Sequence, residues 1–201
     1  MDYPDALRHA LVLLTQHPVL DTHNDLPFAL RSRAGGDATA AVGALVEVGE
    51  GLDGTQTDLP RLRLGRVGGQ FWSAYVPASW EGDRAVAATL EQIGLIREMV
   101  AVHPHELAWC ETADDVVTAM AEGRIASLVG LEGGHSVGGS LETLRTMHQL
   151  GARYLTLTHN DTTAWADSAT DEPRHGGLSD EGRDVVRELN RLGMLVDLSH
   201  V

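Results

Sequence analysis

Five side chains that can bind a metal ion or move a proton stand at or near the ends of short apolar runs: His23, Asp25, Glu132, His159 and His200. Imidazole and carboxylate groups are ligands that Zn²⁺ and similar ions take in proteins. Because the runs are rich in Val, Leu and Ile, we expect them to be buried parallel strands. In parallel α/β folds the chemistry collects at the carboxyl ends of the strands. The pattern therefore favours a metal site at that face.

His23 and Asp25 stand two positions apart at the end of the run 19–23. Side chains at positions i and i+2 of a strand point to the same side, so both can face one point while Asn24 faces away. An imidazole and a carboxylate that converge in this way suit Zn²⁺ or a similar divalent ion. The alternative is a structural hydrogen bond between the two side chains. The matching positions of Glu132 and His200 favour the metal.

Glu132 lies in the segment GLEGGHS (130–136), directly after residues that we expect to be buried. A carboxylate has two oxygens and could bridge two ions; the alternative is an ion pair with an arginine. The two glycines after it allow a tight turn, and we interpret His135 as a turn residue rather than a ligand. His159 could be a ligand or a donor to a substrate oxygen, and the alternative is a structural core histidine.

Strand and helix patterns alternate along the chain. The expected strands are 19–23, 67–76, 124–132, 152–159 and 194–200, and the expected helices are 83–102, one that begins near 112, 140–151 and 178–193. We expect Thr112, Ser140 and Ser179 to cap helices and Gly193 to end one. Such alternation implies a parallel sheet, either open and doubly wound or closed into a barrel. Residues 32–59 show little periodicity, and we interpret them as a long loop.

Composition limits the partners and the compartment. The chain has 201 residues, which suits one domain or part of a larger one, and its net charge of −14 argues against nucleic acid as a partner. No apolar run has the length of a membrane-spanning helix. The first residues, MDYPDALRHALVLL, lack the basic region and cleavage site of a signal peptide. Cys110 is the single cysteine, so no disulfide can form within the chain. We therefore expect a cytoplasmic protein without a membrane partner.

Five segments, in order along the chain, resemble the renal (membrane) dipeptidase family of zinc peptidases. The resemblance extends from about residue 18 to residue 201. The segments are DTHNDLP (21–27), TDLPRLRLGRVGGQFWSAYVP (57–77), ASLVGLEGGHS (126–136), YLTLTHN (154–160) and NRLGMLVDLSHV (190–201). A chance match of five such segments in one order is very improbable.

The resemblance implies a (β/α)8 TIM barrel of the metal-dependent hydrolase superfamily that holds two zinc ions. By the same resemblance, His23 and Asp25 hold one ion and Glu132 bridges both. His200 holds the second ion together with a histidine from a later strand. A water between the ions would have a lowered pKa and act as hydroxide near neutral pH, which makes Glu132 the expected catalytic residue.

The implied reaction is hydrolysis of dipeptides, often with a D-residue at the carboxyl-terminal position. The resemblance gives His159 a contact with the substrate and its carbonyl, and it gives Tyr75 a position near the substrate. Asp161 stands where secreted mammalian members have a disulfide cysteine, which fits a cytoplasmic bacterial member. Members of the family are often homodimers.

The chain ends at Val201, directly after His200, whereas a complete barrel takes about 250 residues or more. We therefore expect residues 1–201 to be a partial barrel domain with about the first five β/α units and without the C-terminal strands. The part beyond would supply the other histidine ligand, a substrate-binding arginine and a catalytic aspartate, so we expect this chain alone to be inactive. Two alternatives stay open: another amidohydrolase-type metal hydrolase of the superfamily, or a metal-binding fragment without activity.

Overall fold

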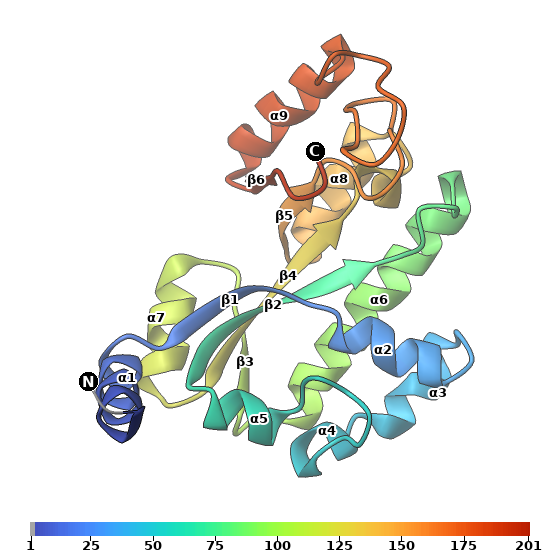
Figure 1. Ribbon diagram of the computed structural model, residues 1–201. Helices are drawn as coiled ribbons and strands as arrows, with labels where there is room; N and C mark the ends of the chain where they lie inside the picture. Colours follow the sequence, from blue (N-terminus) through green and yellow to red (C-terminus); the bar gives the residue numbers. More distant parts are fainter. Residues whose placement is uncertain (1–2) are drawn as a thin grey trace.

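Parallel strands form one curved sheet in residues 3–201, the part of the chain that the computed structural model describes (Figure 1). The strand order is β1-β2-β4-β5-β6, and β3 pairs with β4 beside this path. Every pairing is parallel, so the carboxyl ends of the strands share one edge. The strands are β1 (Val19–Asn24), β2 (Val67–Tyr75), β3 (Leu107–Trp109), β4 (Ile125–Glu132), β5 (Ala152–Thr156) and β6 (Leu195–Asp197).

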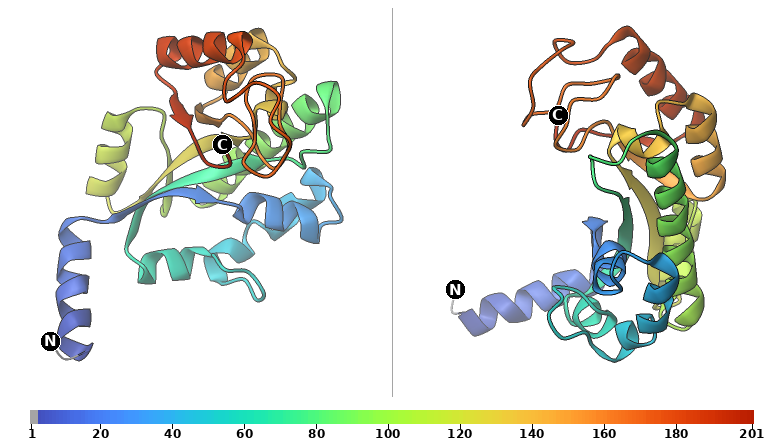
Figure 2. Two further views of the ribbon diagram at one scale, coloured as in Figure 1. Left: turned by 45° about the horizontal axis from the view of Figure 1, so that its top comes forward. Right: turned by 90° about the vertical axis from the view of Figure 1, so that its right-hand side faces the viewer.

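Helices connect the strands and pack mainly against the outer side of the curve (Figure 2). The long helix α6 contacts β2, β3 and β4, whereas α7 contacts β4 and α8 contacts β5. Helix α1 projects from the sheet and is almost wholly exposed. The helices are α1 (Tyr3–Gln16), α2 (Leu26–Arg33), α3 (Ala38–Ala41), η1 (Val42–Ala44), α4 (Glu47–Glu50), α5 (Leu59–Leu64), α6 (Gly82–Val102), α7 (Ala113–Ala121), η2 (Gly134–Val137), α8 (Leu141–Gln149) and α9 (Asp180–Leu192).

The ends of three helices follow the expected caps. Thr112 begins α7 in a capping box with Asp115, in which each side chain accepts a backbone N–H of the other residue. The side chains of Ser140 and Ser179 accept backbone amides in the first turns of α8 and α9. Gly193 ends α9 with a φ of 72°, a left-handed conformation that glycine adopts without steric cost.

Strand β4 is the centre of the sheet, and all eight of its residues are buried. Val129 and Leu131 belong to the main core, whereas Leu128 belongs to a separate cluster. Because successive side chains of a strand point to opposite faces, Gly130 and Glu132 share the face of Leu128. The strand therefore ends with a buried carboxylate on the inner side of the curve.

The prediction of a long loop over residues 32–59 is wrong. The segment contains α3, η1 and α4, and the Asp37 side chain accepts two backbone amides at the start of α3. Its buried apolar side chains include Ala41, Leu45, Val48 and Leu52. Their spacing of four, three and four positions is helical. The three glycines between them, at positions 43, 49 and 51, obscured this periodicity.

The five expected strands are confirmed, and β3 is an addition to them. A strand of three residues, Leu107–Trp109, is too short to show a pattern in the sequence. Strands β5 and β6 end at Thr156 and Asp197, each three residues earlier than expected. His159 and His200 therefore lie in the segments that follow these strands.

Two observations concern the predicted compartment. No helix within residues 3–201 is both long and apolar enough to cross a membrane. Cys110 is a buried free thiol, and burial raises its pKa. The expectation that no signal peptide is present concerns the first residues of the chain. Residues 1 and 2 lie outside the part that the structure describes.

The terminal strands of the path, β1 and β6, each pair with one strand in the described sheet and so present an open edge. Both edges carry apolar side chains, of which Leu20 is 49% exposed and Leu195 is 60% exposed. Strand edges with unpaired backbone groups and apolar side chains promote association between chains.

We expect Leu195→Lys to reduce self-association of the chain, because a charge on an edge strand opposes pairing with another strand. The control is Leu64→Lys, at a position on α5 that is 81% exposed and lies on no sheet edge. Sedimentation velocity at increasing protein concentration measures the effect. Equal behaviour of the two variants would contradict a role for the strand edge.

Candidate metal centre

The predicted site residues converge at the carboxyl ends of the strands. His23 lies in β1 and Asp25 directly follows it, at the start of α2. Glu132 is the last residue of β4. His159 and His200 follow β5 and β6. These side chains form two overlapping groups that share Glu132: one with His23 and Asp25, and one with His159 and His200.

The first group brings one imidazole nitrogen between two carboxylates. His23 Nε2 lies 3.3 Å from Asp25 Oδ2 and 3.4 Å from Glu132 Oε2. Asn24 points the other way and donates to Thr57 Oγ1. His23 and Asp25 thus face one point, as their spacing in the sequence predicts.

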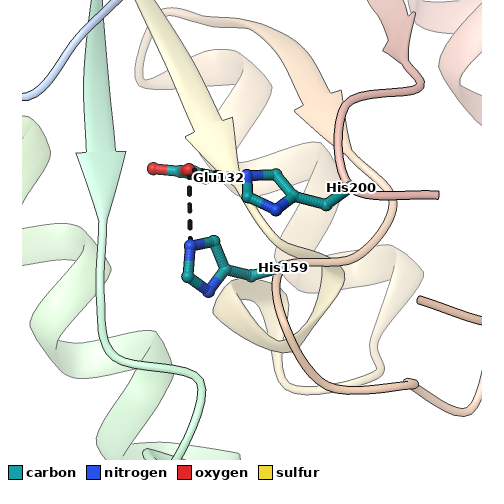
Figure 3. Close-up of side chains that lie close together, drawn as sticks. All are labelled: Glu132, His159 and His200. Atoms are coloured by element: carbon teal, nitrogen blue, oxygen red, sulfur yellow. Dashed lines mark ion pairs between the residues drawn. The ribbon is translucent and has the colours of Figure 1, made fainter. Parts of the chain in front are cut away.

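Glu132 presents its second oxygen to the other group (Figure 3). Its Oε1 lies 3.4 Å from His200 Nε2 and 3.7 Å from His159 Nε2. Ser73 Oγ donates to Oε2 at 3.0 Å. Among the described residues no arginine pairs with Glu132, so the alternative of a strand-end ion pair with arginine is not what the structure has. Each carboxylate oxygen therefore faces a separate set of nitrogen atoms.

The charges in the first group fit a cation. Hydrogen bonds with Asp25 and Glu132 raise the pKa of His23 to about 10, although partial burial opposes the shift. Partial burial is the largest single influence and raises the pKa of Asp25, but the hydrogen bond and charge of His23, together with a hydrogen bond from Ser73, lower the net pKa. Two carboxylates thus hold one protonated ring between them. A divalent ion would supply this positive charge and leave the ring nitrogen free to coordinate.

The ring of His159 packs between the rings of His200 and Tyr75 near the carboxyl ends of the strands. Its ring centroid lies 4.5 Å from that of His200 and 5.0 Å from that of Tyr75, which in turn contacts Phe28 edge-on at 4.7 Å. Burial lowers the pKa of His159 and raises that of Tyr75. Nδ1 of His159 is buried without a hydrogen-bond partner in the described part of the chain. The ring is therefore neutral near pH 7 and has an unused polar atom.

Hydrogen bonds from the segment between β5 and α9 hold the backbone of His200. Its φ is 69°, which is unusual for a residue other than glycine. The carbonyl oxygen of His200 accepts from Ala169 N at 2.9 Å, Thr158 Oγ1 at 3.1 Å and Ser168 Oγ at 3.3 Å. These three donors fix the imidazole of His200 next to Glu132 although β6 has already ended.

Asp167 organises the loop that supplies two of these donors. Its carboxylate accepts backbone N–H groups of Arg174, His175 and Gly177 at 2.7 to 3.1 Å. The amides of Gly177 and Arg174 are the main causes that lower the pKa of Asp167 to about 2. The ionised carboxylate therefore stabilises the fold of this loop, and the loop supports His200.

Two further polar residues have structural roles, and for His135 this agrees with its interpretation as a turn residue. His135 lies in η2, and its Nε2 is 3.0 Å from the carbonyl oxygen of Val76. Asp197 accepts from Thr156 Oγ1 at 2.6 Å and from the hydroxyl of Ser199 at 2.8 Å. Neither belongs to the two candidate ligand groups.

Two residues that contact the site were not predicted. Ser73 bonds to Glu132, and Tyr154 Oη lies 3.0 Å from His23 Nδ1. Ser73 stands two positions before Tyr75 in β2 and so shares its face, which is a weak signal in the sequence. Nothing in the sequence indicates the contact of Tyr154, because it joins β5 to β1 across the inside of the curve.

A cleft of about 470 Å³ opens beside His23 and Asp25. Asn24, Arg33 and Thr57 are among the residues that line it. Its volume is within the usual range for sites that bind small molecules. A small ligand in this cleft would lie next to the first group.

A curved parallel sheet with histidines and carboxylates at its strand ends is the arrangement that the resemblance to metal-dependent hydrolases predicts. The chain belongs to the membrane dipeptidase family, peptidase family M19, whose family model matches residues 7–201. It is 43% identical over 203 residues to dipeptidase 3 of Rattus norvegicus, covering 98% of this chain and 39% of that protein. It is 40% identical over 215 residues to dipeptidase verJ of Clonostachys rogersoniana, covering 98% and 52%. The chain thus spans about two fifths to one half of these relatives.

Solved structures share the fold. Dipeptidase AC, a metallopeptidase of family M19, matches with a TM-score of 0.77 and 28% identity, over 92% of this chain and 56% of its own. A metallopeptidase from Rhodobacter sphaeroides, solved with a phosphinate mimic of the dipeptide L-Ala-D-Ala, matches with a TM-score of 0.74 and 26% identity, over 92% and 59%. These matches confirm the prediction of a partial (β/α)8 barrel.

We expect Asp167→Asn to destabilise the chain at neutral pH and to flatten its stability profile in acid. Because the pKa of Asp167 is lowered from 3.8 to about 2, its contribution is present above pH 4, approximately, and is lost as the pH falls toward 2. Chemical denaturation across this range measures the effect. Asp184→Asn, at an exposed position on α9, is the control; if it changes the profile equally, the loop carboxylate has no special role.

Proposed function

We propose that this chain forms part of a zinc-dependent dipeptidase that hydrolyses the peptide bond of dipeptides, including L,D-dipeptides. One observation carries the proposal: one oxygen of the buried Glu132 carboxylate faces a nitrogen of His23, and the other faces nitrogens of His159 and His200. A carboxylate placed in this way suits the bridge between two metal ions. Membership of a family of dipeptidases supplies the reaction class.

The proposed ligands follow from the two groups. His23, Asp25 and one oxygen of Glu132 would hold the first zinc ion, and the other oxygen of Glu132 would share the second ion with His200. Bound zinc would polarise a substrate carbonyl and lower the pKa of a water molecule, so that hydroxide is available near pH 7. Glu132 is thus the proposed catalytic residue, because it would touch the reacting centre through both of its oxygens.

His159 and Tyr75 are the proposed substrate contacts. Because the ring of His159 is neutral and partly buried, it can donate a hydrogen bond to the carbonyl oxygen of a substrate without adding positive charge to the site. Tyr75 is the last residue of β2, in register with Glu132. Its ring packs between Phe28 and His159 and would form a wall of the substrate site.

The proposed substrate is supported by the relatives. The Rhodobacter enzyme was solved with a phosphinate mimic of the dipeptide L-Ala-D-Ala. A cytoplasmic location, a bacterial source and a homodimer stay predictions from the sequence and its resemblance.

The proposal is tested by zinc content per chain together with hydrolysis of L-Ala-D-Ala. Both are measured on this chain and on a form extended at its carboxyl end. We expect zinc in both forms and turnover in the extended form, because the relatives are about two to two and a half times as long as this chain. Zinc without turnover of any dipeptide in both forms would contradict the dipeptidase and leave a metal site.

Glu132→Gln is expected to reduce zinc content and, in the extended form, to lower turnover by roughly 100-fold or more, since it removes a proposed ligand rather than an outer partner, whose loss typically costs 10- to 100-fold. Glutamine keeps the size of the side chain but offers one oxygen in place of two. Glu142→Gln, at an exposed position on α8, is the control and should bind zinc as the wild type does. Full zinc content and near wild-type turnover in Glu132→Gln would exclude the bridge.

A further inference from the structure

The imidazole of His23 has a second nitrogen that faces away from the carboxylates. Its Nδ1 lies 3.0 Å from Tyr154 Oη, whereas Nε2 lies between Asp25 and Glu132. A neutral ring that offers Nε2 to an ion carries its hydrogen on Nδ1. In that state Nδ1–H donates to the phenolic oxygen of Tyr154. Both nitrogens of the ring would then have a defined partner.

The contact is made across the inner face of the sheet. Tyr154 belongs to β5 and His23 to β1, and β2 and β4 lie between them. Gly130 pairs with Tyr154 in the ladder between β4 and β5. A Cβ atom on Gly130 would lie only 1.9 Å from Cζ of Tyr154. The tyrosine ring therefore lies across the backbone of β4 at a position where only glycine leaves room.

The surroundings of Tyr154 hold its ring in this direction. The side chain is 4% exposed, and its ring centroid lies 5.2 Å from that of Phe71 on β2. Within residues 3–201 its hydroxyl has no hydrogen-bond partner other than His23. A buried phenol usually takes one polar partner, and here that partner is a proposed metal ligand.

We propose that Tyr154 is a positioning residue, whose hydroxyl fixes the ring of His23 so that Nε2 points to the first metal ion, and that Gly130 is required because it admits the tyrosine ring. The inference rests on the proposed function, since it assumes that His23 binds a metal ion. Partners of this kind set the tautomer and orientation of a ligating histidine and raise its basicity.

The test is Tyr154→Phe, which keeps the ring against Gly130 and Phe71 and removes only the hydroxyl. We expect the Kd for Zn²⁺ to rise about 10- to 100-fold, measured on the metal-free chain by competition with a chelator of known affinity. Histidine ¹⁵N spectra of the zinc-loaded wild type should show His23 with its hydrogen on Nδ1, and this signal should shift in the variant. A purely structural tyrosine would not change that signal.

Ser127→Ala is the matched control. It removes another buried hydroxyl, this one on β4, whose one hydrogen bond within residues 3–201 goes to the carbonyl oxygen of Ile125. We expect its Kd for Zn²⁺ to equal that of the wild type. If it weakens zinc binding as much as Tyr154→Phe does, the effect comes from general loosening of the sheet, and the inference is wrong.

Gly130→Ala tests the second half of the inference. The added Cβ would displace the tyrosine ring, so we expect weaker zinc binding in the presence of Tyr154 and no additional loss when combined with Tyr154→Phe. A folded Tyr154→Phe variant with a Kd within twofold of the wild type would overturn the inference even if Gly130→Ala does not fold. A wild-type chain that binds no zinc would instead contradict the proposed metal centre, and the inference with it.

Discussion

The structure of this site depends on the proximity of two carboxylates at the carboxyl ends of β1 and β4. Glu132 is buried at 6% exposure and shares His23 Nε2 with the more exposed Asp25. The two carboxylates repel each other and Glu132 also loses hydration, so the pair favours a positive charge between its members. A proton on His23 supplies that charge when no ion is bound, which is why the pKa of this histidine is raised to about 10. A cation would replace the proton and take the ring nitrogen as a ligand.

The fold brings these groups together through the common direction of its strands. Because all the pairings are parallel, the ends of β1, β4, β5 and β6 meet at one face. The alternation of β4 then places both Gly130 and Glu132 on the inner side. Gly130 makes room for the ring of Tyr154 from β5. The two oxygens of Glu132 face the two candidate ligand groups. One strand thus sets the position of the carboxylate and of the space beneath it.

Much of this arrangement is visible in the sequence, and the rest depends on register and packing. Apolar runs followed by His23, Glu132 and His200 predict strands and the face at which they end. The short helices between residues 32 and 59 were missed because glycines interrupt their apolar spacing. The contacts of Ser73 and Tyr154 depend on which residues lie opposite each other in neighbouring strands, and a single sequence does not specify that register.

The two ligand groups differ in how firmly they are held. The first is built from the ends of β1 and β4, and Ser73 fixes the shared carboxylate through Oε2. In the second, His159 and His200 lie beyond their strands, and His200 depends on donors from a loop that Asp167 stabilises. Rigid elements hold ligands more accurately than loops do. The first group is therefore the more preorganised one, and because Oε2 is fixed there, Oε1 of Glu132 is already directed at the second.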